Sequence, residues 1–431
     1  MKSADLIIHN AGQLVTCASN GKPKRLADMR SAGIVENGAV AIADGAILAA
    51  GTSGDILREF SGEEVVDAGG RVVCPGFVDP HTHIVFGGDR FNEFELKIKG
   101  AEYLEILAGG GGIISTVRQT REAAILELTG QTLKRLEKMM AHGTTTCEIK
   151  TGYGLDTETE IKMLKVIGLL EESHPVDIVA TFLAAHAVPP EFKDNPDGYT
   201  DLICDEMLPL AWEWFGSLRG ARRGSFISRH FFADVFCEKN AFSLEQSARL
   251  MKTAADLGFK LKAHVDEFTN LGGSRLGVDL GAVSIDHLDA ISEEEIKLLA
   301  ASDTIGIVTP TVNFNFGSAE FADARKLIDA GCAVALSTDY NPGSAPCPSQ
   351  PMVMAIACRY QKLLPAEALN AITVNAAFAI GLGEETGSIE TGKQADILIL
   401  DTRDYREIAY EFGSNFVETV IKKGIIQPPA R

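Results

Sequence analysis

The sequence lacks three features that mark large classes of proteins: closely spaced cysteine pairs, a long apolar run and an excess of positive charge. Its eight cysteines are scattered over 431 residues with no C-x-x-C spacing, which argues against a disulfide scaffold or a cysteine-ligated zinc module. No uninterrupted apolar stretch approaches the ~18 residues that a membrane span needs, and the N-terminal residues show no signal-peptide pattern. We therefore expect a cytoplasmic protein with no membrane partner.

Acidic side chains outnumber basic ones, with 59 Asp and Glu against 40 Lys and Arg, for a net charge of −19 at pH 7. Nucleic acids and anionic membrane surfaces are bound by basic faces, so we expect no nucleic acid among the partners. An anionic substrate would have to be attracted by local cations against this overall field.

The composition that remains, 45% hydrophobic and 23% charged, is that of a globular protein with a large core. The two ends of the chain resemble each other and differ from the middle. Short strand-like runs such as Asp5–Ile8 and Ala395–Leu400 occur at both ends, and Asp44-Gly45 predicts a hairpin turn. Residues 1–73 and 384–431 are therefore expected to form a small discontinuous β-sandwich domain.

Between these ends, residues 74–383 alternate strand-like runs with stretches of helical periodicity, such as Ile125–Met140, Glu158–Glu172, Ser243–Leu257 and Glu293–Ala300. Eight such strand–helix units predict an α/β fold with a (β/α)8 TIM-like barrel, whose active site lies at the carboxyl ends of the strands. The predicted strands are Gly76–Asp79, Thr144–Ile149, Asp177–Leu183, His230–Phe236, Lys260–His264, Val283–His287, Thr304–Val308 and Ala333–Ser337.

Metal-ligand side chains recur at the ends of these strands. His81 and His83 follow the first strand two residues apart, so both can lie on one face of an extended chain. An isolated H-x-H can also be two buried, hydrogen-bonded histidines, but here it is joined by His264, His287 and Asp339 at the ends of strands five, six and eight. We predict one ion held by His81, His83, His264 and Asp339, a donor set that suits zinc or iron.

Two longer motifs identify a family resemblance. Residues 75–83 (PGFVDPHTH) and 387–396 (GSIETGKQAD) resemble motifs of the amidohydrolase superfamily. The resemblance to this superfamily extends over nearly the whole chain. Within that superfamily the chain resembles the imidazolonepropionase family. The motifs that carry this closer resemblance are Gly87–Arg90, Glu148–Gly154, Ala184–Pro190, His264–Glu267 and Thr338–Ser344.

The resemblance implies a hydrolase of histidine degradation. It would open the cyclic amide of 4-imidazolone-5-propanoate with a water activated by a single metal, giving N-formimidoyl-L-glutamate, and it would be a homodimer. Binuclear members of the superfamily use a carboxylated lysine at the end of strand four, where this chain has none. Lys150, which follows strand two, is interpreted as a salt-bridged or surface lysine.

Glu267, His287 and Asp339 are the expected catalytic residues. Glu267 can hydrogen-bond the attacking water and move a proton, whereas His287 can orient that water or stabilise the developing oxyanion. A proton must then reach the leaving ring nitrogen, and Asp339 and Glu267 are both candidates for that transfer.

The substrate's propanoate needs a cation, and Arg90 can bind a carboxylate with two parallel hydrogen bonds. The resemblance adds other substrate contacts to Arg90 and Glu267, namely Tyr153, His186, Asn341, Gly343 and Ser344. The four glycines Gly109–Gly112 are expected to form a flexible loop, with a role as a lid left open.

Two other functions use the same pattern. A metal-dependent nucleobase deaminase resembling cytosine or guanine deaminase would share His81, His83, His264, Glu267 and Asp339, but a neutral base offers Arg90 no carboxylate. A non-catalytic barrel acting as a binding protein would carry no metal, although no ligand position is missing here.

Overall fold

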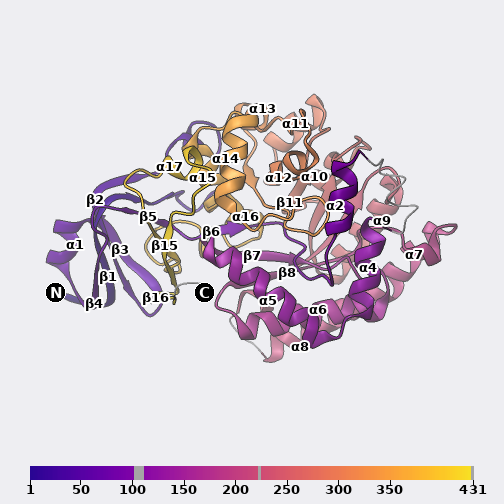
Figure 1. Ribbon diagram of the computed structural model, residues 1–431, viewed down its shortest axis with the longest axis horizontal. Helices are drawn as coiled ribbons and strands as arrows, with labels where there is room; N and C mark the ends of the chain where they lie inside the picture. The colour runs from indigo at the N-terminus through magenta and orange to yellow at the C-terminus, as the bar shows by residue number, and fades with distance from the viewer. Residues whose placement is uncertain (101–110, 222–224, 429–431) are drawn as a thin grey trace.

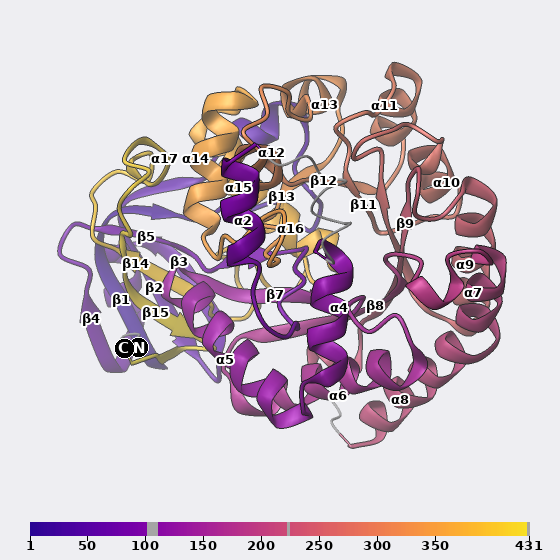
Figure 2. The ribbon, with the colours of Figure 1, turned by 45° about the vertical axis from the view of Figure 1, so that its right-hand side comes forward.

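The computed structural model describes residues 1–100, 111–221 and 225–428, which form a barrel and a separate sheet (Figure 1). The sheet lies at one end of the molecule, and the barrel with its surrounding helices makes up the rest (Figures 1 and 2). Among the described residues, no helix combines the length and the apolar character needed to cross a membrane.

The barrel contains eight parallel strands that follow one another in chain order from β6 to β13. Every residue of β7, β8 and β11 is buried, as expected for parallel strands with side chains on one face and helices on the other. Each predicted strand overlaps one observed strand, so the prediction of the barrel is confirmed. The strands are β6 (Phe77–Asp79), β7 (Thr144–Lys150), β8 (Asp177–Ala185), β9 (Phe231–Cys237), β10 (Lys260–Val265), β11 (Ser284–His287), β12 (Ile305–Val308) and β13 (Val334–Leu336).

The first and last strands are joined mainly through the side chain of Asp79 in β6. Its carboxylate accepts hydrogen bonds from the Ser337 hydroxyl at 2.5 Å and from the Thr338 hydroxyl at 2.6 Å, directly after β13. The backbone N–H of His83 donates to the carbonyl of Tyr340 at 3.0 Å. These bonds bring the segments that follow β6 and β13 together, and both segments carry predicted metal ligands.

Helices follow the strands around the outside of the barrel (Figure 2). Helix α9 begins with a capping box, in which Ser243 and Gln246 bond each other's backbone N–H groups. The four helices predicted from periodicity occur with boundaries within one residue of those expected, as α5 (Ile125–Ala141), α6 (Thr157–Ser173), α9 (Leu244–Leu257) and α11 (Glu293–Ala300). The other helices of the barrel region are α2 (Phe91–Ile98), α4 (Ile113–Glu122), α7 (Pro196–Leu202), α8 (Leu208–Ala221), α10 (Gly273–Asp279), α12 (Pro310–Phe316), α13 (Ala324–Ala330), α14 (Gln350–Tyr360), α15 (Pro365–Ala371) and α16 (Val374–Ala379).

The two ends of the chain form one eight-stranded, mostly antiparallel sheet, in the order β16-β15-β14-β5-β1-β2-β3 with β4 alongside β1. Alternate residues of β1 belong to different apolar clusters, Leu6 and Ile8 to one and Ile7 to another, so both faces of the sheet bury apolar side chains. The elements are β1 (Lys2–Val15), β2 (Ile34–Ala43), β3 (Ala46–Thr52), α1 (Ser53–Glu59), β4 (Phe60–Asp67), β5 (Val72–Pro75), β14 (Ile397–Leu400), α17 (Glu407–Tyr410), β15 (Val417–Lys422) and β16 (Ile425–Ile426). The domain boundaries expected after residues 73 and 383 stay a prediction.

A buried ion cluster joins the terminal sheet to the amino end of a barrel strand. The Lys422 ammonium of β15 donates to Asp177, the first residue of β8, at 2.5 Å and to Asp396 at 2.6 Å. Its side chain is 3% exposed, whereas that of neighbouring Lys423, which also bonds Asp177, is 50% exposed.

We expect Lys422→Ala to lower the free energy of unfolding by about 3–5 kcal/mol, because two carboxylates would lose a buried partner. Lys423→Ala is the matched control, with an expected loss of about 0–1 kcal/mol for an exposed pair. Chemical denaturation of both variants measures the difference, and equal losses would contradict the assignment of Lys422 as the buried link.

Candidate metal centre and active site

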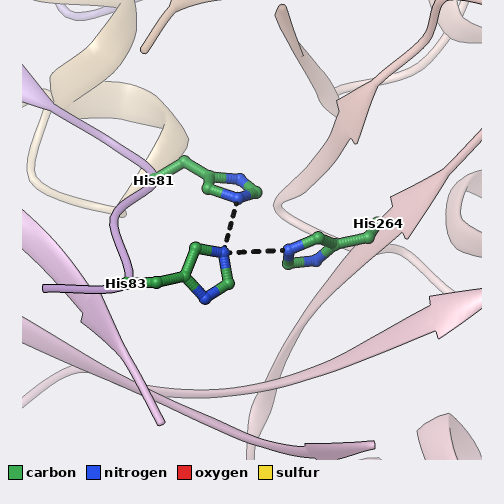
Figure 3. Close-up of side chains that lie close together, drawn as sticks. All are labelled: His81, His83 and His264. Atoms are coloured by element: carbon green, nitrogen blue, oxygen red, sulfur yellow. Dashed lines mark hydrogen bonds between the residues drawn. The ribbon is translucent and has the colours of Figure 1, made fainter. Parts of the chain in front are cut away.

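Three imidazoles and one carboxylate converge at the carboxyl end of the barrel. His81 and His83 follow β6, His264 lies in β10, and their side chains point toward one another (Figure 3). The Nε2 atom of His83 lies 3.1 Å from Nε2 of His81 and 3.3 Å from Nε2 of His264. The Asp339 Oδ1 atom, which follows β13, lies 3.4 Å from the Nε2 atoms of both His81 and His83.

The chemistry of these donors fits a single cation. Burial lowers the pKa of His81 and His83 well below the usual value, so both imidazoles are neutral and carry a nitrogen lone pair. The Oδ1 atom of Asp339 is buried and has no hydrogen-bond partner in the described part of the chain. Around an ion with bonds of about 2.0–2.1 Å, the corners of a tetrahedron lie about 3.3 Å apart. The observed spacings of 3.1–3.4 Å between His83 and each of the other three donors, and between His81 and Asp339, match that edge.

Two carboxylates in the barrel interior orient two of the three imidazoles. Asp286 Oδ2 lies 2.6 Å from Nδ1 of His81, and Asp234 Oδ1 lies 3.1 Å from Nδ1 of His264. Each contact fixes the proton on Nδ1 and leaves Nε2 free as a ligand. Sequence reasoning missed both residues, although Asp286 directly precedes His287 and Asp234 occurs within the fourth predicted strand.

Lys150 is salt-bridged, as one of its two interpretations predicted, but it is fully buried and therefore not a surface residue. Its side chain extends across the barrel interior. There the ammonium donates hydrogen bonds to Asp234 at 2.8 Å and to Glu148 at 2.6 Å. Burial alone would lower the pKa of Lys150, but the negative charges of Asp234, Glu148 and Asp286 raise it above the usual value. Lys150 is therefore a permanent cation beneath the histidines.

Glu267 and His287 lie beside the ligand cluster, as expected for groups that act on a water there. The His287 Nε2 atom is buried without a hydrogen-bond partner and lies 3.9 Å from Glu267 Oε2. Its Nδ1 atom lies 3.1 Å from the Thr309 hydroxyl, a polar residue that follows β12. Burial raises the pKa of Glu267 well above its usual value, and the charge of Asp339 raises it further.

Backbone strain occurs at two of the expected catalytic residues. His287 has φ of 84° and Asp339 has φ of 48°, both in the left-handed region that residues with a Cβ rarely occupy. Such conformations cost energy and persist where the surrounding structure imposes them, which is common at functional sites. These backbone conformations direct both side chains from the strand ends toward the cluster of His81, His83 and His264.

Arg90 and the loop after β13 are brought together. The Arg90 Nε donates to the Thr116 hydroxyl at 2.8 Å, and its guanidinium lies so close to Gly343 that a Cβ there would meet Nη1 at 2.2 Å. A side chain at position 343 would therefore displace the Arg90 guanidinium from the place it occupies. The Asn341 side chain accepts hydrogen bonds from the N–H groups of Gly343 and Ser344, both at 2.8 Å, and so orders this loop.

Tyr153 and His186 line the side of the cluster formed by the segments after β7 and β8. The His186 ring stacks on His83 with centroids 4.8 Å apart, and the Tyr153 ring lies 5.4 Å from His186. The Nδ1 atom of His186 lies 3.0 Å from the Gly152 carbonyl, and burial lowers the pKa of His186 to about 3. His186 is therefore neutral and presents Nε2 as an acceptor.

Of the glycine run considered as a loop or lid, Gly109 and Gly110 lie outside the described residues. Gly112 immediately precedes α4, and its N–H donates to Glu93 at 2.9 Å. The role of this run as a lid stays a prediction.

Comparison with known proteins gives one family and several close relatives. Models of the amidohydrolase family match residues 240–426 and 64–101. The chain is 51% identical to the imidazolonepropionase of Chloroflexus aggregans, over 98% of both chains. It is 49% identical to the imidazolonepropionase of Herpetosiphon aurantiacus, over 98% of this chain and 97% of that protein.

Solved structures share the fold at much lower identity. An adenosine deaminase from Xanthomonas campestris with bound zinc has a TM-score of 0.74 at 21% identity, over 100% of this chain and 94% of that one. Guanine deaminase from E. coli has a TM-score of 0.68 at 15% identity, over 98% of both chains. At these identities the likeness establishes the barrel and its appended sheet as a shared fold.

We expect Asp286→Ala to weaken metal binding by about 10- to 100-fold, because His81 would lose the acceptor that holds its Nδ1 proton. Asp286→Asn keeps an oxygen acceptor and is expected to lose less. Competition with a chromophoric chelator measures the affinity of each variant. An alanine variant that binds metal as tightly as the parent would contradict the orienting role of Asp286.

Proposed function

Because the chain belongs to the imidazolonepropionase family of the amidohydrolases, we propose that it hydrolyses the cyclic amide of 4-imidazolone-5-propanoate to N-formimidoyl-L-glutamate in histidine degradation. The chain is thus a metal-dependent hydrolase of this family. The observation that carries the proposal is the cluster of three imidazoles and a carboxylate, in a chain 51% identical to an imidazolonepropionase over 98% of its length.

We assign the metal to His81, His83, His264 and Asp339, as one zinc or iron ion per chain. Support comes from the neutral imidazoles of His81 and His83, the Asp339 oxygen that has no hydrogen-bond partner among the described residues, and the 3.1–3.4 Å spacing of His83 from the other three donors. When bound, such an ion lowers the pKa of water to about 7 and so supplies hydroxide near neutral pH.

Glu267, His287 and Asp339 are proposed to handle protons and charge during ring opening. The raised pKa of Glu267 suits a group that both accepts and donates a proton during the reaction. His287, with an unpartnered buried Nε2, can hold the oxygen of the substrate carbonyl as it becomes negative. Glu267 and Asp339 are the two candidates that return a proton to the leaving ring nitrogen.

We assign Arg90 to the substrate's propanoate. Its side chain is 11% exposed and hydrogen-bonded to Thr116, so the guanidinium is held in place rather than free in solvent. Its one described ion pair, with Glu93, is long at 3.9 Å, which leaves the positive charge poorly compensated. Tyr153, His186, Asn341, Gly343 and Ser344 complete the proposed substrate site, with Asn341 ordering the loop that carries the last two.

The nucleobase deaminase alternative has weaker support. The solved deaminases share the fold at 15–21% identity, whereas the imidazolonepropionases share 49–51% identity over nearly all of the chain. A poorly compensated cation beside the cluster also suits an anionic substrate better than a neutral base. A cytoplasmic homodimer without a nucleic-acid partner remains our expectation for the assembled enzyme.

The proposal is tested by measuring metal content and turnover of 4-imidazolone-5-propanoate together, for the parent and for Arg90→Ala. We expect one metal per chain in both, and a Michaelis constant raised by about 10- to 100-fold in the variant, the equivalent of a charge-assisted hydrogen bond. The exposed Arg118 of α4 supplies the control Arg118→Ala, with an unchanged constant.

The opposite outcomes identify the alternatives. An unchanged Michaelis constant in Arg90→Ala would remove Arg90 from carboxylate binding. Release of ammonia from cytosine or guanine, with imidazolone propanoate untouched, would indicate the deaminase. A parent chain purified gently without metal would indicate a non-catalytic barrel.

We expect Glu267→Gln to lower kcat by about 10²- to 10⁴-fold, because the amide cannot accept or donate the transferred proton. Metal content should stay at that of the parent, since Glu267 is not among the proposed ligands. Steady-state kinetics with metal analysis measures both quantities, and the exposed Glu245→Gln serves as the control. A kcat within twofold of the parent would exclude Glu267 from proton transfer.

A further inference from the structure

The hydroxyl of Thr309 contacts the ring of His287, and no role described so far uses this contact. The Thr309 Oγ1 atom lies 3.1 Å from Nδ1 of His287, and Thr309 is 2% exposed. Thr309 directly follows β12, at the carboxyl end of the barrel where the proposed active site lies. It is therefore placed to influence a proposed catalytic residue through the nitrogen other than Nε2.

The position of Thr309 in its own helix shows that the hydroxyl is directed away from a common local use. Thr309 is the N-cap of α12, where a threonine hydroxyl commonly accepts a hydrogen bond from a backbone N–H of the first turn. The Thr309 side chain makes no such capping bond. In the described part of the chain, the ring of His287 is the one hydrogen-bond partner of this hydroxyl.

This contact decides which ring nitrogen of His287 carries the hydrogen. If the hydroxyl accepted a hydrogen bond from Nδ1, its own hydrogen would be buried without an acceptor among the described residues. A buried donor without a partner costs free energy comparable to a lost hydrogen bond, whereas an unused oxygen lone pair is tolerated more often. The hydroxyl therefore donates to Nδ1, which leaves the ring hydrogen on Nε2.

The surroundings of Nε2 agree with this assignment. The His287 Nε2 atom lies 3.9 Å from Glu267 Oε2. A ring nitrogen of His287 and a carboxylate oxygen of Asp339 also lie within 4.8 Å of each other. A hydrogen on Nε2 would face oxygens that can accept it, whereas a lone pair there would face other lone pairs. Since Nε2 has no hydrogen-bond partner among the described residues, its hydrogen is available to an oxygen that enters the site.

We propose that Thr309 is a positioning residue, which holds His287 in the tautomer with hydrogen on Nε2 and directs that hydrogen toward the carbonyl oxygen of the substrate. This inference rests on the proposed function, in which His287 stabilises this oxygen as it becomes negative. The left-handed backbone of His287 and Leu288, with φ of 84° and 69°, fixes where the ring begins. The hydrogen bond from Thr309 then fixes how the ring is turned and which nitrogen faces the site.

Nitrogen NMR of the chain purified with ZnCl2 and isotope-labelled at histidine tests the tautomer directly, because protonated and unprotonated ring nitrogens resonate at well-separated frequencies. The spectrum of His287→Gln identifies the His287 signals by their absence. We expect hydrogen on Nε2 of His287 in the parent. Thr309→Val has a similar shape but no hydroxyl, and we expect part of the His287 hydrogen to move to Nδ1. Thr309→Ser keeps the hydroxyl and is expected to restore the spectrum of the parent.

Steady-state kinetics with 4-imidazolone-5-propanoate measures the consequence for the reaction. We expect Thr309→Val to lower kcat by about 3- to 10-fold, the equivalent of one hydrogen bond. The Michaelis constant should stay within about twofold of the parent, because a contact to the developing charge strengthens mainly in the transition state. Thr309→Ser should recover most of the lost kcat.

Thr304→Val is the matched control, because it removes a buried threonine hydroxyl from the opposite end of the same strand. Thr304 directly precedes β12, is 3% exposed, and donates to the carbonyl of Ala282 at 2.7 Å. We expect Thr304→Val to keep the kcat and the His287 spectrum of the parent.

Three results would overturn the proposal: hydrogen on Nδ1 of His287 in the parent, a Thr309→Val spectrum identical to that of the parent, or an equal loss of kcat in Thr304→Val. The parent spectrum decides the first of these even if a variant fails to fold. A parent that does not hydrolyse 4-imidazolone-5-propanoate would contradict the proposed function instead, and hydrogen on Nε2 of His287 in that chain would still support the assignment of Thr309.

Discussion

The active-site end of this molecule depends on one constraint: four atoms that each carry a lone pair must lie close together. The His83 Nε2 atom lies 3.1–3.4 Å from the donor atoms of His81, His264 and Asp339 in the barrel interior, and the Nδ1 atoms of two of these imidazoles are already bonded to carboxylates. Lone pairs do not attract one another at this distance, so the arrangement is stable with a cation between them or where the barrel imposes it. Asp79, which ties β6 to β13, and the strained backbone of His287 and Asp339 show how the barrel imposes it.

The fold, and the convergence of the side chains proposed as ligands, could be predicted from the sequence because both depend on local patterns. Strand–helix alternation located all eight barrel strands, and the positions of His81, His83, His264 and Asp339 at strand ends followed from it. Asp234 and Lys150 were different. Their roles depend on the Lys150 side chain, which extends from β7 to β9 through the barrel interior. The spacing of residues along the chain does not show which inward-facing side chains meet there.

The chain has a net charge of −19 and yet orders a buried guanidinium, proposed to bind the substrate's carboxylate, through local contacts. Arg90 is ordered by Thr116 and packs against Gly343, where no side chain intervenes. The cationic group is therefore placed in advance, which reduces the entropy lost on binding. The same loop carries Asp339, so the residues proposed to bind the substrate's carboxylate and the metal are linked by a few residues of backbone.

The zinc-containing adenosine deaminase and this chain share a fold at 21% identity, which means that the barrel alone does not select the reaction. What differs between such enzymes must lie in side chains at the strand ends and in the interior beneath them. Here those side chains include a guanidinium at the rim and an ammonium below the histidines. The proposed role of the rim cation is to bind the charge of the substrate, whereas the interior cation bonds Asp234, which in turn bonds the proposed ligand His264. Substitution of the first is therefore expected to act on substrate binding, and substitution of the second on the orientation of a metal ligand.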